Sequence, residues 1–323
     1  LGNTVNIKTS IDVARARADR AAVIPFTIKN EDFNLSAQLK IFSQQDKVYL
    51  EFQSYIDQID VTKINQNIPE VLANTQSTIW LDKVITEGIL TDIMLTTRFN
   101  ISGELETPNT KFSANLKDAK LNVNSGWTPI TDLNAKVTFS NDYVNITGKN
   151  AKLDVINLSY FNISTRNFNK PEAQLVLNGR FNSESETISQ FIKQSPVPVR
   201  VKDYLNEFEL SGDIWGNVTI VAPFQQDTKK KFEVDFDMYV TDNTLSLFDK
   251  KFAVKQYNSQ ISYHDGFIQT KGKGEIGGEL FELALNPNDW IDNKSSKLRV
   301  KMSHTDDNID AYISKKTRNE WHT

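Results

Sequence analysis

Apolar and polar residues alternate strictly over long stretches of this sequence. In residues 232–241 every second side chain is aliphatic, aromatic or Met, and those between them are acidic or carry a hydroxyl. A period of two residues is typical of β-strands with one apolar and one polar face. Further runs of this kind lie at 93–101, 112–116, 133–139, 175–177, 218–220 and 281–285. The pattern predicts a mainly β protein, with a hairpin where Asn141-Asp142 separates two runs.

Helix signals are few and short. Ser77 can cap a helix with an apolar stripe that Gly88 would end, the stripe being Trp80, Leu81, Val84 and Ile85. A second helix is predicted from about Glu184 and must end before Pro196. Weaker signals lie at 203–207, near Pro69, and after Thr305-Asp306, where the stripe would be Ile309, Tyr312 and Ile313.

The helix and the strands after it recur along the chain. Residues 111–116 resemble 231–236 at an offset of about 120, and residues 133–144 resemble 257–268 at about 124. Gly88 corresponds to Gly212 at the offset of about 124 residues. Such self-similarity is typical of repeat architectures. We interpret 61–180 and 181–287 as two copies of one helix-plus-meander unit, with 1–60 as a partial N-terminal repeat and 288–323 as the start of a further unit.

Composition excludes several classes of function. The 323 residues carry 37 basic and 41 acidic side chains, so the basic excess that nucleic-acid binding needs is missing. The absence of Cys excludes disulfides, thiolate nucleophiles and cysteine zinc sites. No run reaches the roughly 18 apolar residues of a membrane span. The start at Leu1, with no initiator Met or signal sequence, indicates an internal or processed piece.

Motifs that resemble enzyme sites are better explained as parts of strands and turns. The spacing of glycines from Gly272 to Gly277 is that of the dinucleotide-binding fingerprint. However, a strand pattern follows where that fingerprint requires a helix. Its glycines are expected to permit bulges or bends of a curved sheet. His264-Asp265-Gly266 fits a hairpin tip, and the three His are spaced unlike metal ligands. We therefore expect no enzyme activity, no catalytic residue, no cofactor and no metal.

A repeated meander with one apolar face must cover that face or use it for binding. The sheet can pair with a second sheet, close into a barrel, or curl into a groove that stays open to an apolar ligand. Alternation alone does not distinguish these three outcomes.

The sequence resembles the AsmA-like superfamily, in particular its YhdP branch and the similar TamB proteins. The resemblance rests on the run from Trp127 to Phe139 with its continuation to Leu153, on Ile68-Pro69 with Trp80-Leu81, and on Ser195-Pro196 with Val218 to Pro223. It covers roughly residues 55–285. It implies a periplasmic protein of Gram-negative bacteria, anchored in the inner membrane by a helix absent from this chain. The implied fold is an elongated, curved antiparallel sheet that carries phospholipid towards the outer membrane.

A groove of this kind would shield acyl chains from water. Exposing a chain of about sixteen methylenes costs roughly 0.8 kcal/mol for each, so about 13 kcal/mol in total. The expected partners are phospholipid acyl chains, the inner membrane and other envelope proteins. The candidate lining residues lie on the apolar faces of the expected strands: Val137, Phe139, Val144, Ile146, Leu175, Leu177, Val218, Ile220, Phe232, Val234, Phe236, Met238, Ile261, Phe281 and Leu283.

Two alternative functions remain. A structural or assembly scaffold of the cell envelope would have the same sheet with its apolar face sealed. A glycan-binding β-protein would expose aromatic side chains beside carboxylates, with Trp127, Trp215 and Trp290 as the first candidates. Val137→Asp separates an open face from a sealed one, because a carboxylate severely destabilises only a sealed core.

Overall fold

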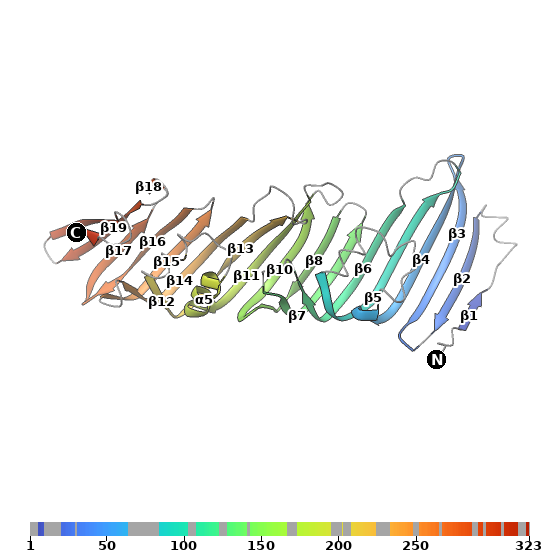
Figure 1. Ribbon diagram of the computed structural model, residues 1–323, viewed down its shortest axis with the longest axis horizontal. Coiled ribbons are helices and arrows are strands. Elements are labelled where there is room, and N and C mark those ends of the chain that lie inside the picture. Colours follow the sequence, from blue (N-terminus) through green and yellow to red (C-terminus); the bar gives the residue numbers. More distant parts are fainter. Residues whose placement is uncertain are drawn as a thin grey trace. The chain divides into compact units, whose positions relative to one another are not determined.

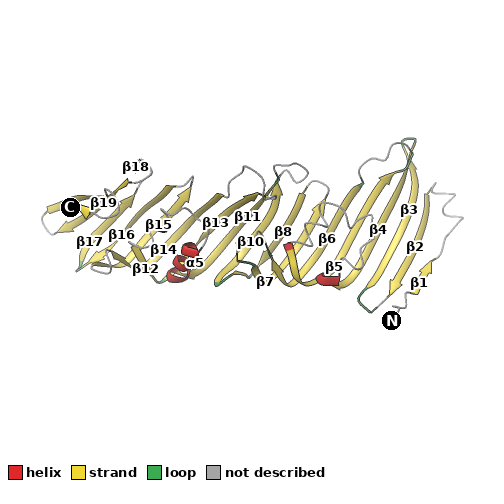
Figure 2. Ribbon diagram, in the orientation of Figure 1, coloured by secondary structure: helices red, strands yellow, loops and turns green. Residues whose placement is uncertain are grey.

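A computed structural model describes residues 6–9, 21–29, 31–63, 84–102, 108–122, 128–140, 143–166, 173–194, 202, 208–223, 233–247, 252–264, 267–285, 290–292, 295–304, 307–315 and 321–322. Side chains are described between residues 21 and 285. Antiparallel strands make up most of this part of the chain (Figures 1 and 2). The chain is thus mainly β, as the alternation predicts.

The chain divides into two compact units. Unit 1 comprises residues 1–153, 160–176 and 222–231, and unit 2 comprises 154–159, 177–221 and 232–323. The boundaries proposed from the sequence repeat stay a prediction.

Unit 1 is a meander in which strands pair in chain order (Figure 1). Its elements are β1 (Asn6–Thr9), β2 (Ala21–Lys29), β3 (Asn34–Gln44), β4 (Lys47–Asp60), the short 3-10 helix η1 (Val61–Lys63), β5 (Ile85–Asn100), β6 (Asn109–Leu121), β7 (Ile130–Ser140), β8 (Tyr143–Lys149) and β9 (Ala151–Leu153). Strand β10 (Ile156–Arg166) pairs with β8 through its unit 1 residues. The expected hairpin is confirmed by the pairing of β7 with β8.

In unit 2 the strands again pair mostly in chain order, and a helix lies between its first two strands. Its elements include β11 (Gln174–Glu184), α5 (Ser185–Gln194), β12 (Phe208–Ser211), β13 (Asp213–Pro223), β14 (Glu233–Leu247), β15 (Phe252–His264), β16 (Phe267–Ile276), β17 (Glu279–Leu285), β18 (Trp290–Asp292), β19 (Ser295–His304), β20 (Asp307–Lys315) and β21 (Trp321–His322). Strand β14 pairs with β12 and β13 on one side and with β15 on the other. The expected strands at 218–220 and 281–285 thus lie in β13 and β17, and the described part of the run at 232–241 lies in β14.

The helix predictions have mixed outcomes. Helix α5 is confirmed; its Ile188 and Ile192 are buried, and it ends before Pro196. The prediction of a helix running to Gly88 is wrong in its last turn, because β5 begins at Ile85. The predicted C-terminal helix is also wrong, because Ile309 and Ile313 belong to β20, which pairs with β19. The weak signals near Pro69 and at 203–207 lie outside the described residues, as does most of the Ser77 helix.

Backbone geometry repeats at a spacing of 124 residues. Gly88 and Gly212 both have strongly positive φ, as do Asp118 and Asp242 at register shifts in β6 and β14. The backbone N–H of each Asp donates to an Asn side chain of the next strand, Asn134 in one case and Asn258 in the other. Bulged positions of this kind favour residues that tolerate the left-handed region. The two meanders are therefore built on one pattern of bulges.

The strand register corrects part of the sequence alignment. Phe112 pairs with Phe139, and Phe236 pairs with Tyr263, so Phe112 corresponds to Phe236 at a spacing of 124. The offset of about 120 that placed Phe112 on Phe232 is wrong by four residues. A shift by an even number keeps apolar residues on the same face, so alternation does not detect it.

Glycines make room for aromatic rings on the apolar face. The ring of Phe161 in β10 covers Gly148 in β8, and the ring of Tyr257 in β15 covers Gly272 in β16. Gly272 therefore serves close packing. Gly274 lies opposite a register shift of β15, between the Asn258–Lys273 and Lys255–Glu275 pairs, so the expectation that these glycines permit bulges is confirmed at Gly274 and not at Gly272.

Gly148→Ala is expected to destabilise the protein by about 1–3 kcal/mol, because overpacking a buried site forces neighbours to move. The added methyl carbon would lie 2.5 Å from the Asn134 carbonyl oxygen and 2.7 Å from Phe161 Cε1. Urea unfolding measures the loss. Gly179→Ala is the matched control, since its methyl carbon would find its nearest neighbour, Val218 Cγ1, at 3.3 Å. An equal loss in both variants would contradict this packing.

Candidate functional site

One face of unit 1 is apolar from β2 to β8. The strand register places one row of directly paired residues across these strands: Phe26, Ala37, Ser54, Leu95, Phe112, Phe139 and Val144. The neighbouring row contains Ala114, Val137, Ile146 and Ile163. Because direct partners point to the same side of a sheet, four of the predicted lining residues share this face.

A corresponding face of unit 2 carries most of the other predicted residues. Val218 pairs with Phe236, Ile220 with Val234, and Met238 with Ile261. Phe281 and Leu283 of β17 pair with Gly274 and Gly272 of β16. Leu175 and Leu177 of β11 are buried, and Phe232 lies outside the described residues.

Exposure of the apolar face varies along unit 1. Val137 and Ile146 are 0% exposed, as closely packed as any protein core. Towards β2, β3 and β4 the same face opens: the small Ala37 is buried, but larger side chains such as Phe26, Leu39 and Phe52 are half-buried. Ile41 of β3 is 36% exposed although it lies on this face, paired with Leu50. The face is therefore tightly packed at Ala114, Val137 and Ile146, half-buried at Phe112 and Phe139, and most accessible at the large apolar side chains of β2–β5.

We call the accessible part the open stretch and define it by Ile24, Phe26, Leu39, Ile41, Leu50, Phe52, Leu95 and Phe99. Register places these residues on one side of β2–β5, and none of them is fully buried. The rings of Phe26 and Phe52 lie 6.3 Å apart between centroids. The sequence prediction missed this stretch, although residues 35–41 alternate as strictly as those chosen.

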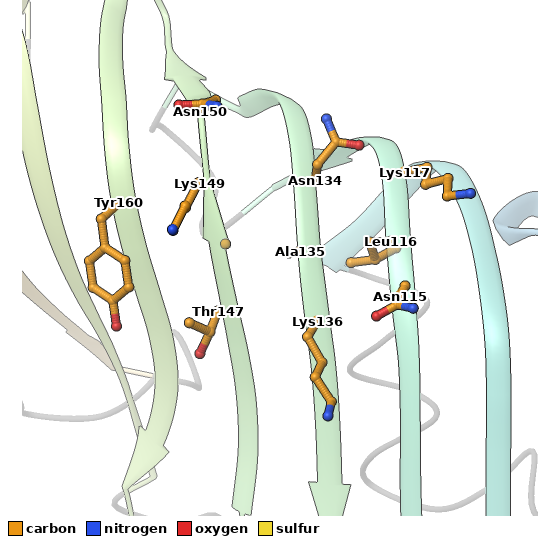
Figure 3. A pocket seen from close by; sticks show the side chains of 11 residues that line it. Asn115, Leu116, Lys117, Asn134, Ala135, Lys136, Thr147, Lys149, Asn150 and Tyr160 are labelled. Atoms are coloured by element: carbon orange, nitrogen blue, oxygen red, sulfur yellow. The ribbon is translucent and has the colours of Figure 1, made fainter.

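The opposite face of unit 1 is polar and holds a hollow of about 520 Å³ over β6, β7, β8 and β10 (Figure 3). Its lining includes Lys136, Thr147, Lys149 and Tyr160 (Figure 3). Exposed ammonium and hydroxyl groups suit water rather than an acyl chain. The hollow therefore does not extend the apolar site.

The polar face of unit 2 exposes the aromatic pair Trp215 and Tyr239. Trp215 is 48% exposed and stacks on Tyr239 with ring centroids 4.2 Å apart. This is the kind of feature a glycan reader would need, but cross-strand aromatic pairs also stabilise sheets on their own. Trp127 lies outside the described residues, and the side chain of Trp290 is not described.

Beside this pair, Asp237 accepts a hydrogen bond of 2.5 Å from the Ser262 hydroxyl. That bond, followed by the interaction with His264 at 3.3 Å, holds the pKa of Asp237 below its ordinary value. His264 also lies 3.6 Å from Asp235. Among the described residues no group of three or more His, Asp or Glu is placed to hold a metal ion. The cluster consists of exposed side chains on a polar sheet face.

Comparisons with known proteins place the chain in one family. The family model described as YhdP protein matches residues 8–307. Searches among curated proteins and solved structures find no significant match. Among the residues that the structure describes, no helix is long and apolar enough to cross a membrane.

Proposed function

Because the chain belongs to the YhdP protein family, we propose that its apolar sheet face holds phospholipid acyl chains in transit between the membranes of the bacterial envelope. The family is one of lipid-transport proteins of the envelope. The finer proposal is that this chain works in the periplasm, with its full-length protein anchored in the inner membrane.

The open stretch is the observation that carries this proposal. An apolar, aromatic-rich surface left accessible on a sheet is costly in water unless a ligand covers it. Phe26, Leu39 and Phe52 offer an acyl chain a surface without charges. Transfer from water to such a surface returns roughly 0.8 kcal/mol per methylene.

The chemistry of the face would also allow an acyl chain to move along it. Aliphatic and aromatic side chains make contacts without preferred direction, so an acyl chain gains similar energy at successive positions. Leu95 and Phe112 continue the row from the open stretch towards Phe139 and Val144. Phe139, one of the predicted lining residues, is half-buried like Phe52. The other three in β7 and β8, which are Val137, Val144 and Ile146, would take up acyl chain only if the packed part of the face also opens.

An envelope scaffold is the second candidate function. The observation that favours it is the complete burial of Val137 and Ile146, which leaves no ligand-accessible surface at these two side chains. In a scaffold, the half-exposed residues of β2–β5 would contact another protein instead of lipid.

Photocrosslinking from the two sides of β4 distinguishes these functions. Benzoylphenylalanine in place of Phe52 lies on the open stretch, and in place of Tyr55 it lies on the opposite face of the same strand. We expect the protein, expressed in the periplasm of a Gram-negative host, to crosslink phospholipid from position 52 and not from position 55. Native mass spectrometry should also detect copurified phospholipid. Crosslinks to protein alone from position 52, with no bound lipid, would support the scaffold.

A further inference from the structure

The apolar face of unit 2 carries hydrogen-bonding side chains at four positions where unit 1 has apolar ones. At the spacing of 124 residues, Ala119, Leu133, Ala135 and Ile146 of unit 1 correspond to Asn243, Tyr257, Ser259 and Thr270 of unit 2. The strand register agrees, since Ala119 pairs with Leu133 and Asn243 pairs with Tyr257. Likewise Ala135 pairs with Gly148, and Ser259 pairs with Gly272.

We call Asn243, Tyr257, Ser259 and Thr270 the polar island. The Tyr257 ring lies on Gly272, and its hydroxyl forms hydrogen bonds with Ser259 and Thr270. The hydroxyl oxygens of Ser259 and Thr270 are 2.8 Å apart. Three of the four members are therefore held in place by one another.

Asn243 differs from the other three members. Its side chain is 3% exposed, and its Nδ2 has no hydrogen-bond partner. The amide lies against Gly212, just as Ala119 lies against Gly88 in unit 1. An unmade buried donor is costly, and such groups in native proteins call for an explanation. Because unit 1 fills the same position with a methyl group, packing does not require an amide here.

The surroundings define the chemistry of the missing partner. Nδ2 is a donor, so its partner is an acceptor. Burial raises the pKa of Tyr257, so this phenol stays uncharged. The neighbouring buried residues on this face are apolar: Met238, Val240, Leu245 and Leu283. Because the described neighbours on this face include no cation, the island suits a neutral acceptor rather than a phosphate, whose charge would be left uncompensated.

We propose that the polar island binds the ester carbonyl of a glycerolipid whose acyl chain lies on the apolar face of unit 2. The inference rests on the proposed function and adds a preference for ester-linked lipid. Asn243 is packed nearly as closely in this structure as Val137, so the carbonyl reaches its Nδ2 when this part of the face opens, and Nδ2 then donates to the carbonyl oxygen. The Tyr257, Ser259 and Thr270 hydroxyls lie on the β16 side of Asn243 and keep that side of the site polar. Unit 1, with apolar residues at all four positions, has no such preference.

A competition between ester and ether lipids tests this assignment. The chain is incubated with vesicles containing equal amounts of dioleoyl phosphatidylethanolamine and its dioleyl ether analogue, which differ in the carbonyl groups. Native mass spectrometry gives the ratio of the two bound lipids. We expect a ratio of about five in favour of the ester, which is the effect of about one neutral hydrogen bond. In Asn243→Ala, which installs the residue of unit 1, the ratio should fall to about one.

The matched control is Asn217→Ala, because Asn217 pairs with Asp237 on the polar face of unit 2. This variant should keep the ratio of the unmodified chain. Thr270→Ile, again the residue of unit 1, should lower the ratio as Asn243→Ala does. Circular dichroism verifies that each variant is folded.

The outcomes separate the two proposals. Binding of both lipids at a ratio of one by the unmodified chain would overturn the polar island and leave lipid transport standing; in that case water would satisfy Asn243. Binding of neither lipid would count against the proposed function itself. An ester preference that persists in Asn243→Ala would also overturn the assignment.

Discussion

Val137→Asp is expected to destabilise unit 1 by about 3–5 kcal/mol, because it places a carboxylate without a partner in a dry core. Val137 is fully buried and pairs with Ala114 and Ile146, which are buried as well. Such a loss is a large part of the roughly 5–15 kcal/mol that stabilises an ordinary domain. Urea unfolding followed by circular dichroism measures it.

Lys136→Asp is the control for this change, because Lys136 is exposed on the opposite face of the same strand. Its effect should stay within about 0.5 kcal/mol. A loss at Val137 as small as that of the control would mean that the face over β7 opens in solution. The accessible surface would then reach the residues predicted from the sequence.

Phe52→Asp is expected to reduce lipid binding at least about ten-fold while the sheet stays folded. Phe52 lies on the same apolar face as Val137, but it is only half-buried, so a carboxylate there keeps contact with water. An acyl chain that binds to the open stretch would cover this carboxylate and remove it from water, and this cost weakens lipid binding. Retention of phospholipid from vesicles, measured by native mass spectrometry, gives the loss.

Ser36→Asp, on the polar face of the neighbouring strand β3, should leave lipid binding unchanged. Equal binding by the Phe52 and Ser36 variants would remove the open stretch from the path of the lipid. The same substitution at Val137 and at Phe52 should thus damage folding in one case and binding in the other.

The sequence was sufficient to predict the strands because period-two alternation is a local signal. Residues 133–139 alternate without interruption, and they form the centre of β7. Ile309 and Ile313 fit both a helical stripe and a strand, and only pairing with β19 decides between the two. Alternation also cannot detect a shift of four residues, so it allows Phe112 to correspond to Phe232 as well as to Phe236.

The sequence predicts that an apolar sheet face forms the candidate site, but it does not predict which part of that face is accessible. Alternation shows which side chains share a face, whereas exposure depends on what packs over that face. Val137 and Leu39 therefore look alike in the sequence, although one is fully buried and the other half-buried. Asn243 was hidden for a different reason: its match to Ala119 requires the register on both sides of the bulge at Asp242.

Chain-order pairing affects how such a protein can change its length. Each strand bonds mainly to the strands just before and after it, so few contacts join distant parts of the sequence. Duplication of one meander with its bulges adds a unit whose internal hydrogen bonds are already complete. The core of one copy can then differ from that of the other, as Asn243 differs from Ala119, without a change in the strand pairing of either copy.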